Sequence, residues 1–312
     1  MTNPPLQGII SYPVTPFDTV TGEVDLAALS RLTDDLVTAG SHAVAPLGST
    51  GESAYLREEE WDAVCATTLQ AVAKRVPTLV GVSHWSTEGT VRRARVAARH
   101  GATAIMVLPQ VYWKLTPAEL ERHYAAVAAA TDLPVMLYNN PGTSGVDLLP
   151  ETVAALARKI PTLTMVKESS GDVARFRALR ELSDGALSVY NGNNPVALEA
   201  FRSGAVGWCT AAPCLVPQRV LELYAAATRG DDVRADAVLA DLLPFLRFIV
   251  DHGLPRAIKA GLRLQGRGSG HPRTPLLPLP DQETEHLRKL LERLAGRPVV
   301  DGQGAGTAEP AA

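Results

Sequence analysis

Short apolar segments alternate with longer amphipathic segments along about the first 230 residues of the chain. The apolar segments have the length of buried strands and predict strands at Gly8–Tyr12, His42–Leu47, Thr78–Val82, Ala104–Leu108, Val135–Tyr138, Leu163–Lys167, Leu187–Tyr190 and Val206–Cys209. The segments between them predict helices at Asp25–Ala39, Arg57–Ala73, Thr87–Arg99, Pro117–Ala130, Pro150–Arg158, Val173–Leu182, Pro195–Arg202 and Pro217–Ala227.

Helix start and stop signals support this division of the chain. Thr116, Asp172 and Asn194 stand directly before predicted helices, where their side chains can accept hydrogen bonds from free backbone N–H groups. Glycines follow helix ends, as in Ala39–Gly40 and His100–Gly101, where the backbone often adopts the left-handed conformation that glycine favours. These signals indicate helices that begin and end between the predicted strands.

The number of strand–helix units predicts an α/β fold, a (β/α)₈ TIM barrel. Eight units fit within the first 230 residues. The rival fold is a doubly wound open sheet, which often carries a glycine fingerprint after its first strand. Residues 12–17 read Tyr-Pro-Val-Thr-Pro-Phe and contain no such fingerprint, so the barrel is favoured.

After residue 230 the pattern changes to helices alone, at Asp232–Asp251, Leu254–Leu264 and Gln282–Ala295. We therefore expect three parts: a barrel with the active site over residues 1–230, a C-terminal helical region over 231–300, and a disordered tail over 301–312. The tail is small and polar, a composition that does not support a packed core.

Composition excludes several classes of function. The formal net charge is −3 and the basic residues are scattered, so we expect no nucleic-acid partner. No apolar run approaches the roughly 20 residues of a membrane span, so no membrane segment is expected. The cysteines Cys65, Cys209 and Cys214 lack metal-ligand spacing, and their odd number fits a reducing cytoplasm. We expect a cytoplasmic protein without a metal or cofactor.

Chemically useful residues follow several predicted strands. Because barrel active sites lie at the carboxyl ends of the strands, these residues should meet on one rim. Lys167 ends the sixth strand, and the other candidates are Gly48, Ser49, Thr50, Tyr112, Tyr138, Thr143, Asn193, Asn194 and Cys209.

A lysine in this position predicts imine chemistry. Loss of solvation favours the neutral amine, which attacks the carbonyl carbon of a 2-keto acid. Tyr138 can supply the proton transfers, with Thr50 and a second tyrosine as a hydrogen-bonded relay. The Gly48–Gly51 backbone can approach and bind a carboxylate. Taken singly, a segment such as Gly48–Gly51 is more often an ordinary loop, and a tyrosine such as Tyr138 is more often a half-buried residue at a strand end. Only the occurrence of several such candidates at the strand ends is a specific indication of this chemistry.

Three motifs together resemble a known superfamily. Gly48–Glu52, Tyr138–Pro141 and Val166–Glu168 are similar, in order, spacing and predicted strand position, to the signatures of the dihydrodipicolinate synthase and N-acetylneuraminate lyase superfamily. The resemblance covers about residues 7–300. It implies pyruvate-type imine chemistry without fixing one substrate.

The resemblance implies a role for each matching residue. Lys167 would be the Schiff-base lysine, Tyr138 the proton-transferring tyrosine, and Thr50 part of its relay. Ser49 and the Ser49 and Thr50 amides would hold the keto-acid carboxylate. Tyr112 would be the relay tyrosine that, in the synthase, one subunit contributes to the active site of the other across a dimer interface.

The resemblance also implies surroundings and assembly. Cys209 would place a backbone carbonyl beside the imine. Such enzymes are often tetramers built as two dimers, so a homotetramer is expected.

The chain also departs from the superfamily's known branches. Thr143 stands where the synthase has an arginine that grips the aldehyde's carboxylate, and threonine cannot replace that contact. A shifted cation such as Lys114 could compensate. Asn194–Pro195 stands where the sialate lyases have acidic residues.

We therefore predict a class I lyase or aldolase that makes or cleaves a C–C bond of a 2-keto acid, with pyruvate as donor or product and an aldehyde partner. Asn140, Thr143, Asn193 and Asn194 offer neutral groups that suit hydroxyls. Three alternatives stay open: dihydrodipicolinate synthase itself, which joins pyruvate to aspartate semialdehyde; a dehydratase or deaminase that uses the same imine; and a non-catalytic keto-acid sensor.

Overall fold

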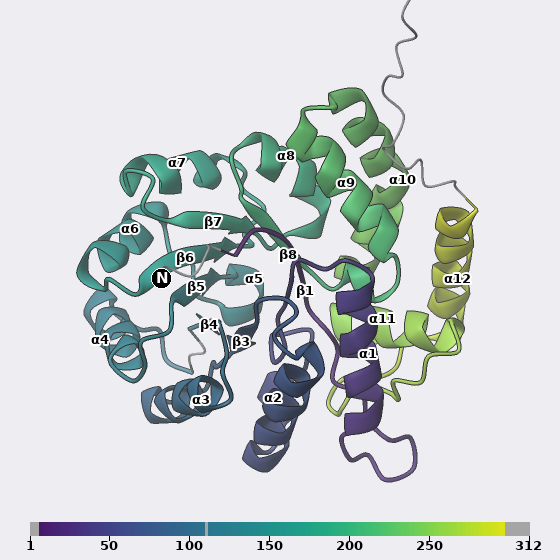
Figure 1. Cartoon of the computed structure of the whole chain (residues 1–312), viewed down its shortest axis with the longest axis horizontal. Coiled ribbons are helices and arrows are strands. Elements are labelled where there is room, and N and C mark those ends of the chain that lie inside the picture. The colour runs from purple at the N-terminus through teal and green to yellow at the C-terminus, as the bar shows by residue number, and fades with distance from the viewer. Residues whose placement is uncertain (1–5, 110–111, 297–312) are drawn as a thin grey trace, which may run out of the picture.

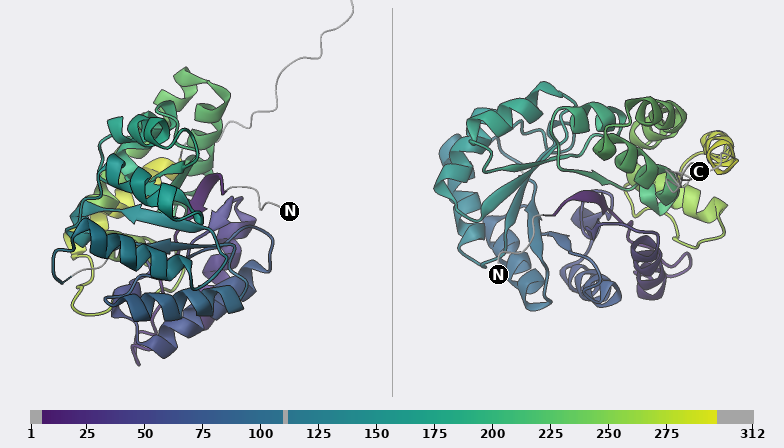
Figure 2. Two further views of the ribbon diagram at one scale, coloured as in Figure 1. Left: turned by 90° about the vertical axis from the view of Figure 1, so that its left-hand side faces the viewer. Right: turned by 45° about the horizontal axis from the view of Figure 1, so that its top comes forward.

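The computed structural model describes residues 6–109 and 112–296, and its eight parallel strands form a barrel surrounded by helices (Figures 1 and 2). The strands are β1 (Gly8–Ser11), β2 (Ala43–Val44), β3 (Leu79–Gly81), β4 (Ala104–Val107), β5 (Val135–Asn139), β6 (Leu163–Glu168), β7 (Ser188–Asn191) and β8 (Gly207–Thr210). Their hydrogen-bonded order is β2-β1-β8-β7-β6-β5-β4-β3. The predicted (β/α)₈ barrel is therefore confirmed.

The ring closes between β2 and β3 through a short seam. A single bridge joins Val44 to Thr78, and the Gly81 N–H donates to the Pro46 carbonyl at 3.0 Å. A Cβ atom on Gly81 would lie 2.2 Å from the Leu47 carbonyl oxygen. The seam therefore requires glycine at position 81, because a side chain would push the two strands apart.

Long helices surround the barrel, whereas the short α5 (Pro141–Ser144) lies at the carboxyl end of β5. The other helices are α1 (Leu26–Thr38), α2 (Glu58–Val72), α3 (Thr87–Arg99), α4 (Pro117–Ala128), α6 (Pro150–Lys159), α7 (Ala174–Leu182), α8 (Ala197–Arg202), α9 (Pro217–Arg229), α10 (Asp232–Asp251), α11 (Leu254–Leu264) and α12 (Asp281–Ala295). Short 3₁₀ helices occur at η1 (Ser53–Tyr55), η2 (Asn194–Val196) and η3 (Ala212–Cys214). The sequence pattern predicted the long helices but not α5.

Most of the predicted helix signals act as expected. The Thr116 side chain caps α4, and Gly40 and Gly101 adopt positive φ after α1 and α3. The prediction for Asn194 is wrong in one respect. Its side-chain oxygen accepts a hydrogen bond from Trp208 Nε1 at 3.1 Å, and η2 precedes α8.

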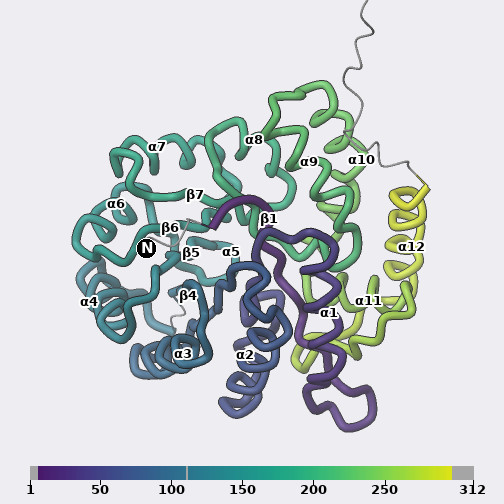
Figure 3. Tube along the Cα trace, viewed as in Figure 1, coloured from purple at the N-terminus to yellow at the C-terminus, as the bar shows by residue number. Residues whose placement is uncertain are grey.

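The last three helices pack on one side of the barrel beside α1 and α9 (Figure 3). They share a hydrophobic cluster with the strands: Ile9 and Ile10 of β1 belong to the same cluster as Phe245 and Leu287. The expected boundary at residue 230 stays a prediction, and the expected tail at 301–312 lies outside the described residues. None of the helices described here is long and apolar enough to cross a membrane.

Candidate active site

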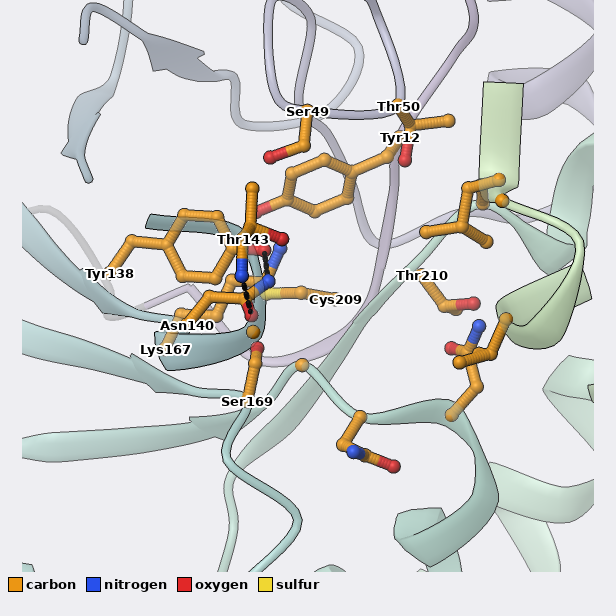
Figure 4. A pocket seen from close by; sticks show the side chains of 18 of the residues that line it. Tyr12, Ser49, Thr50, Tyr138, Asn140, Thr143, Lys167, Ser169, Cys209 and Thr210 are labelled. Carbon is orange, nitrogen blue, oxygen red and sulfur yellow. Dashed lines mark hydrogen bonds between the residues drawn. The ribbon is translucent and has the colours of Figure 1, made fainter. Parts of the chain in front are cut away.

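A cavity of about 520 Å³ opens at the carboxyl ends of the strands (Figure 4). The described residues that line it come from six strand ends or the loops after them and from the stretch where α10 ends and α11 begins: Tyr12, Ser49, Thr50, Tyr138, Asn140, Gly142, Thr143, Lys167, Ser169, Ser170, Gly192, Asn193, Asn194, Cys209, Thr210, Ala211, Val250, Gly253, Leu254 and Pro255. The cavity thus gathers most of the predicted site residues.

Lys167 is held between two aromatic rings. It lies near the end of β6 with 6% of its surface exposed, and its Nζ is 4.1 Å from the centroid of the Tyr12 ring and 4.0 Å from that of Tyr138. Gly192 leaves room for it, since a Cβ there would lie 2.6 Å from Lys167 Cε. The amine is therefore placed by packing on three sides.

Tyr12 is a site residue that our sequence analysis missed. It follows β1, and its hydroxyl donates to the Met106 sulfur at 3.2 Å. Burial, with Cys209 nearby, raises the pKa of Tyr12 well above its usual value, so the phenol stays neutral. The rule that barrel sites lie at strand ends would have found it, because Tyr12 ends the first predicted strand.

Cys209 lies on β8 close to Tyr12 and Lys167. Burial raises the pKa of the Cys209 thiol, with Lys167 and Tyr12 opposing the shift. The thiol therefore stays neutral and is a poor nucleophile. The buried side chain of Cys209 lines the cavity.

The Gly48–Glu52 loop after β2 is fixed from two sides. The Gly51 N–H donates to the Gly48 carbonyl, and Thr15 Oγ1 donates to the Gly51 carbonyl at 2.6 Å. Glu52 forms a fully buried ion pair with Lys259 of α11, with 2.6 Å between Lys259 Nζ and Glu52 Oε1. Helix α11 thereby positions the loop that presents Ser49 and Thr50 to the cavity.

Asn140, Thr143 and Tyr138 form a connected group beside the lysine (Figure 4). Asn140 Nδ2 donates to the Tyr138 hydroxyl oxygen at 2.7 Å, and Asn140 Oδ1 accepts from the Thr143 N–H at 3.2 Å. The second bond caps α5. Within the described chain, no hydrogen bond joins Tyr138 to Thr50, although both line the cavity.

Polar groups from the loops after β6 and β7 complete the wall. The Asn191 side chain bonds the Asn193 backbone twice, which fixes Asn193 at the rim. Asn194 faces the cavity, but its oxygen is engaged by Trp208. The Ser169 hydroxyl is buried without a hydrogen-bond partner among the described residues. Ser169 stands at the predicted end of the sixth strand but was not among the predicted site residues.

The structure places Tyr112 and Lys114 away from the cavity. Tyr112 is 89% exposed and contacts Trp113 edge to face, and a hollow of about 230 Å³ includes both residues and Trp85. Lys114 is exposed and is not among the residues lining the cavity. Their predicted roles as relay and substitute cation stay predictions.

Lys167 is the one charged group among the described residues that line the cavity. Its neighbour Glu168 turns away and accepts hydrogen bonds from Asn139 Nδ2 at 2.9 Å and the Ser170 N–H at 2.6 Å. Glu168 therefore fixes the backbone after β6 and does not line the cavity. The arrangement presents one amine, the side chains of two tyrosines and several neutral hydrogen-bonding groups to a bound molecule.

Comparisons with known proteins identify the family of the chain. The model of the dihydrodipicolinate synthetase family matches residues 5–294. The 4-hydroxy-tetrahydrodipicolinate synthase 2 of Halalkalibacterium halodurans is 33% identical over 286 residues, which cover 92% of this chain and 97% of that protein.

Two solved structures extend the comparison. A Pseudomonas aeruginosa protein provisionally named a dihydrodipicolinate synthetase is 51% identical, with a TM-score of 0.91, over 92% of this chain and 99% of that chain. The Acinetobacter baumannii dihydrodipicolinate synthase, solved with pyruvate, is 31% identical, with a TM-score of 0.89, over 95% of this chain and 100% of that chain. The chain therefore belongs to the dihydrodipicolinate synthetase family, whose members are enzymes of the class I aldolase type.

Proposed function

We propose that this enzyme makes or cleaves a C–C bond of a 2-keto acid through an imine on Lys167, with pyruvate as donor or product. The observation that carries the proposal is the buried amine at a strand end, 4.1 and 4.0 Å from two aromatic ring centroids. Ring faces stabilise a cation. They therefore support the protonated imine, whose positive charge draws electrons from the adjacent carbon.

Neighbouring groups supply binding and proton transfer in this proposal. Ser49 and the backbone amides of Ser49 and Thr50 bind the keto-acid carboxylate. Tyr138 gives its proton to the departing hydroxyl as the imine forms. A relay through Thr50 needs Tyr112 from a partner copy, because the chain's own Tyr112 lies outside the cavity.

The lining supports an acceptor with hydroxyl groups. Asn140, Thr143, Asn193 and Ser169 offer neutral donors and acceptors, and no arginine occurs among the described lining residues. A second carboxylate would therefore lack a charge-assisted partner. A hydroxylated aldehyde, with a 2-keto-3-deoxy sugar acid as its condensation product, satisfies these groups better.

A second candidate is 4-hydroxy-tetrahydrodipicolinate synthesis from pyruvate and aspartate semialdehyde. The name of the 33% identical relative favours it. The missing arginine at Thr143 counts against it, unless Lys114 moves to the cavity or a partner copy supplies a cation.

The assembly proposed here is a homotetramer that works in the cytoplasm. The exposed aromatic side chains Trp85, Tyr112 and Trp113, with 62%, 89% and 79% of their surface exposed, support an interface between copies. The three free, buried cysteines suit a reducing compartment.

Borohydride trapping tests the imine. We expect intact-protein mass spectrometry to show one pyruvyl adduct after treatment with pyruvate and borohydride, and peptide mapping to place it on Lys167. Lys167→Ala should form no adduct. Lys159→Ala, which removes an exposed lysine paired with Glu121, should keep it. An active Lys167→Ala enzyme, or wild type without an adduct from pyruvate or any 2-keto-3-deoxy sugar acid, contradicts the proposal.

Substrate assays separate the two candidates. Cleavage of a 2-keto-3-deoxy sugar acid to pyruvate supports the hydroxylated acceptor. Turnover of aspartate semialdehyde at the rate of a biosynthetic enzyme, in an assay coupled to the reductase, supports the synthase and overturns our reading of Thr143.

A further inference from the structure

Asn140 is held in one orientation by the backbone of α5. Its Oδ1 accepts the N-capping hydrogen bond from the Thr143 N–H at 3.2 Å. A backbone N–H can only donate, so the oxygen of the amide must face Thr143 and the nitrogen must face the opposite way. This geometry directs Asn140 Nδ2 at the hydroxyl oxygen of Tyr138, 2.7 Å away.

The hydrogen bond from Asn140 leaves the hydroxyl hydrogen of Tyr138 free to be donated. A phenolic oxygen carries one hydrogen and accepts through its lone pairs, and Asn140 occupies the accepting side. An amide N–H cannot take up the phenolic proton, so Asn140 cannot serve as a relay. It can only stabilise the oxygen, and most strongly when that oxygen carries negative charge.

We propose that Asn140 is a positioning residue that stabilises the charge developing on the Tyr138 oxygen whenever Tyr138 gives up its proton. The inference rests on the proposed imine chemistry. In the step concerned, the phenolic O–H bond breaks and its proton goes to the hydroxyl of the carbinolamine on Lys167. That hydroxyl leaves as water with its C–O electron pair, the nitrogen lone pair forms the iminium bond, and Tyr138 remains as the phenolate facing Asn140 Nδ2.

A fixed donor beside a buried phenol is suited to this task, because Tyr138 is only 4% exposed and the donor needs no reorganisation as the charge appears. Removing one such donor from an active site costs roughly 100- to 1000-fold in kcat. Among the described residues that line the cavity, the phenolate meets no cation other than the reacting Lys167 nitrogen. The identity of residue 140 should therefore affect the rate of imine formation more than the affinity for the keto acid.

Two substitutions separate this role from the capping role. Asn140→Ser keeps an oxygen that can cap α5, since serine is a good N-cap residue, but it is too short to reach Tyr138. Asn140→Asp keeps the cap and the shape, and replaces the donor with an acceptor of negative charge. We expect both variants to melt near the wild-type temperature and to form the trapped pyruvyl adduct roughly 100-fold more slowly, Asp slower than Ser.

Two measurements distinguish this role of Asn140 from a purely structural one. The alkaline limb of the rate–pH profile should move to higher pH in both variants, with the keto-acid KM changed less than kcat. In a Tyr138→Phe background, Asn140→Ser should cause little further loss, because its effect passes through the phenolic oxygen. Asn140→Ser with the wild-type rate and pH profile, or with an equal loss in the Tyr138→Phe background, overturns the inference.

The experiment also separates this inference from the proposed function. An adduct in wild type with normal kinetics in Asn140→Ser overturns the role of Asn140 alone. Absence of any adduct in wild type overturns the imine proposal, and the role of Asn140 with it.

Discussion

At the scale of single residues, Lys167 is positioned by packing rather than by a counter-ion. No acidic side chain in the described chain forms an ion pair with it, and its Nζ lies 4.1 and 4.0 Å from the ring centroids of Tyr12 and Tyr138. A carboxylate beside the amine would favour the ammonium ion, which is not a nucleophile. The aromatic faces can stabilise the protonated imine after it forms, without a permanent negative charge beside it.

Close packing at Gly192 gives a test of this placement. A Cβ at position 192 would lie 1.9 Å from Ser169 Oγ and 2.6 Å from Lys167 Cε, so the lysine must shift in Gly192→Ala. Displacement of a reacting group by about 1 Å can cost roughly 100-fold in rate. We therefore expect Gly192→Ala to trap pyruvate roughly 100-fold more slowly in a timed borohydride quench.

Gly268→Ala is the matched control, because a Cβ there meets no atom within 4 Å. It should trap pyruvate at the wild-type rate. An unchanged rate in Gly192→Ala would show that the amine adapts without loss and that its exact placement is unimportant.

The sequence predicted those site residues that stand at the ends of apolar runs. Lys167 and Tyr138 follow this rule, and Tyr12 was overlooked although it obeys it. Asn140 offered no comparable signal of its role. Its action depends on two hydrogen bonds whose directions are set by α5, and a short helix of four residues leaves no periodic pattern in the sequence.

At the scale of secondary-structure elements, the buried Glu52–Lys259 pair joins the loop after β2 to α11. Removing one member of a buried ion pair leaves the other charge without compensation, which costs about 3–5 kcal/mol. We expect Lys259→Met to lower the free energy of unfolding by about that amount in urea titrations. It should also raise the KM for pyruvate, because Ser49 and Thr50 lie on the released loop.

Two further variants make this test specific. The double substitution Glu52→Gln with Lys259→Met removes both charges and should recover much of the lost stability. Lys289→Met on the exposed face of α12 should change the free energy of unfolding by no more than about 0.5 kcal/mol. Equal effects at positions 259 and 289 would rule out the structural role of the pair.

Element positions were largely predictable because parallel strands are buried on both faces and read as apolar runs. Their contacts with later helices were not. Glu52 was recognised only as part of a turn motif, and Lys259 lies 207 residues further along the chain. Nothing local to either residue indicates that the two meet.

At the scale of the whole molecule, the aromatic hollow around Trp113 gives a test of the proposed assembly. Wild type should sediment as an oligomer, and Trp113→Glu should shift it toward monomer because it places a charge in an apolar interface. Activity should fall with dissociation if a partner supplies Tyr112. Sedimentation velocity and kcat measured on the same samples check both outcomes.

Val233→Glu provides the control, since Val233 is 84% exposed on α10 and lies outside this hollow. It should leave the sedimentation coefficient unchanged. A wild-type monomer with full activity would contradict both the tetramer and the shared tyrosine.

The alternation of strands and helices predicted the barrel. The exposure of Trp113 could not be predicted from the sequence, because buried and exposed tryptophans cannot be told apart there.

The cavity is lined by residues from Tyr12 to Pro255, which lie far apart in the sequence. A nascent polypeptide leaving the ribosome therefore carries Lys167 long before the α10–α11 connection can complete its surroundings. The ability to form the imine would therefore report on folding. In a refolding time course, a borohydride quench in the presence of pyruvate would label only those molecules whose cavity is complete. Partly folded chains lack an organised cavity and would stay unlabelled.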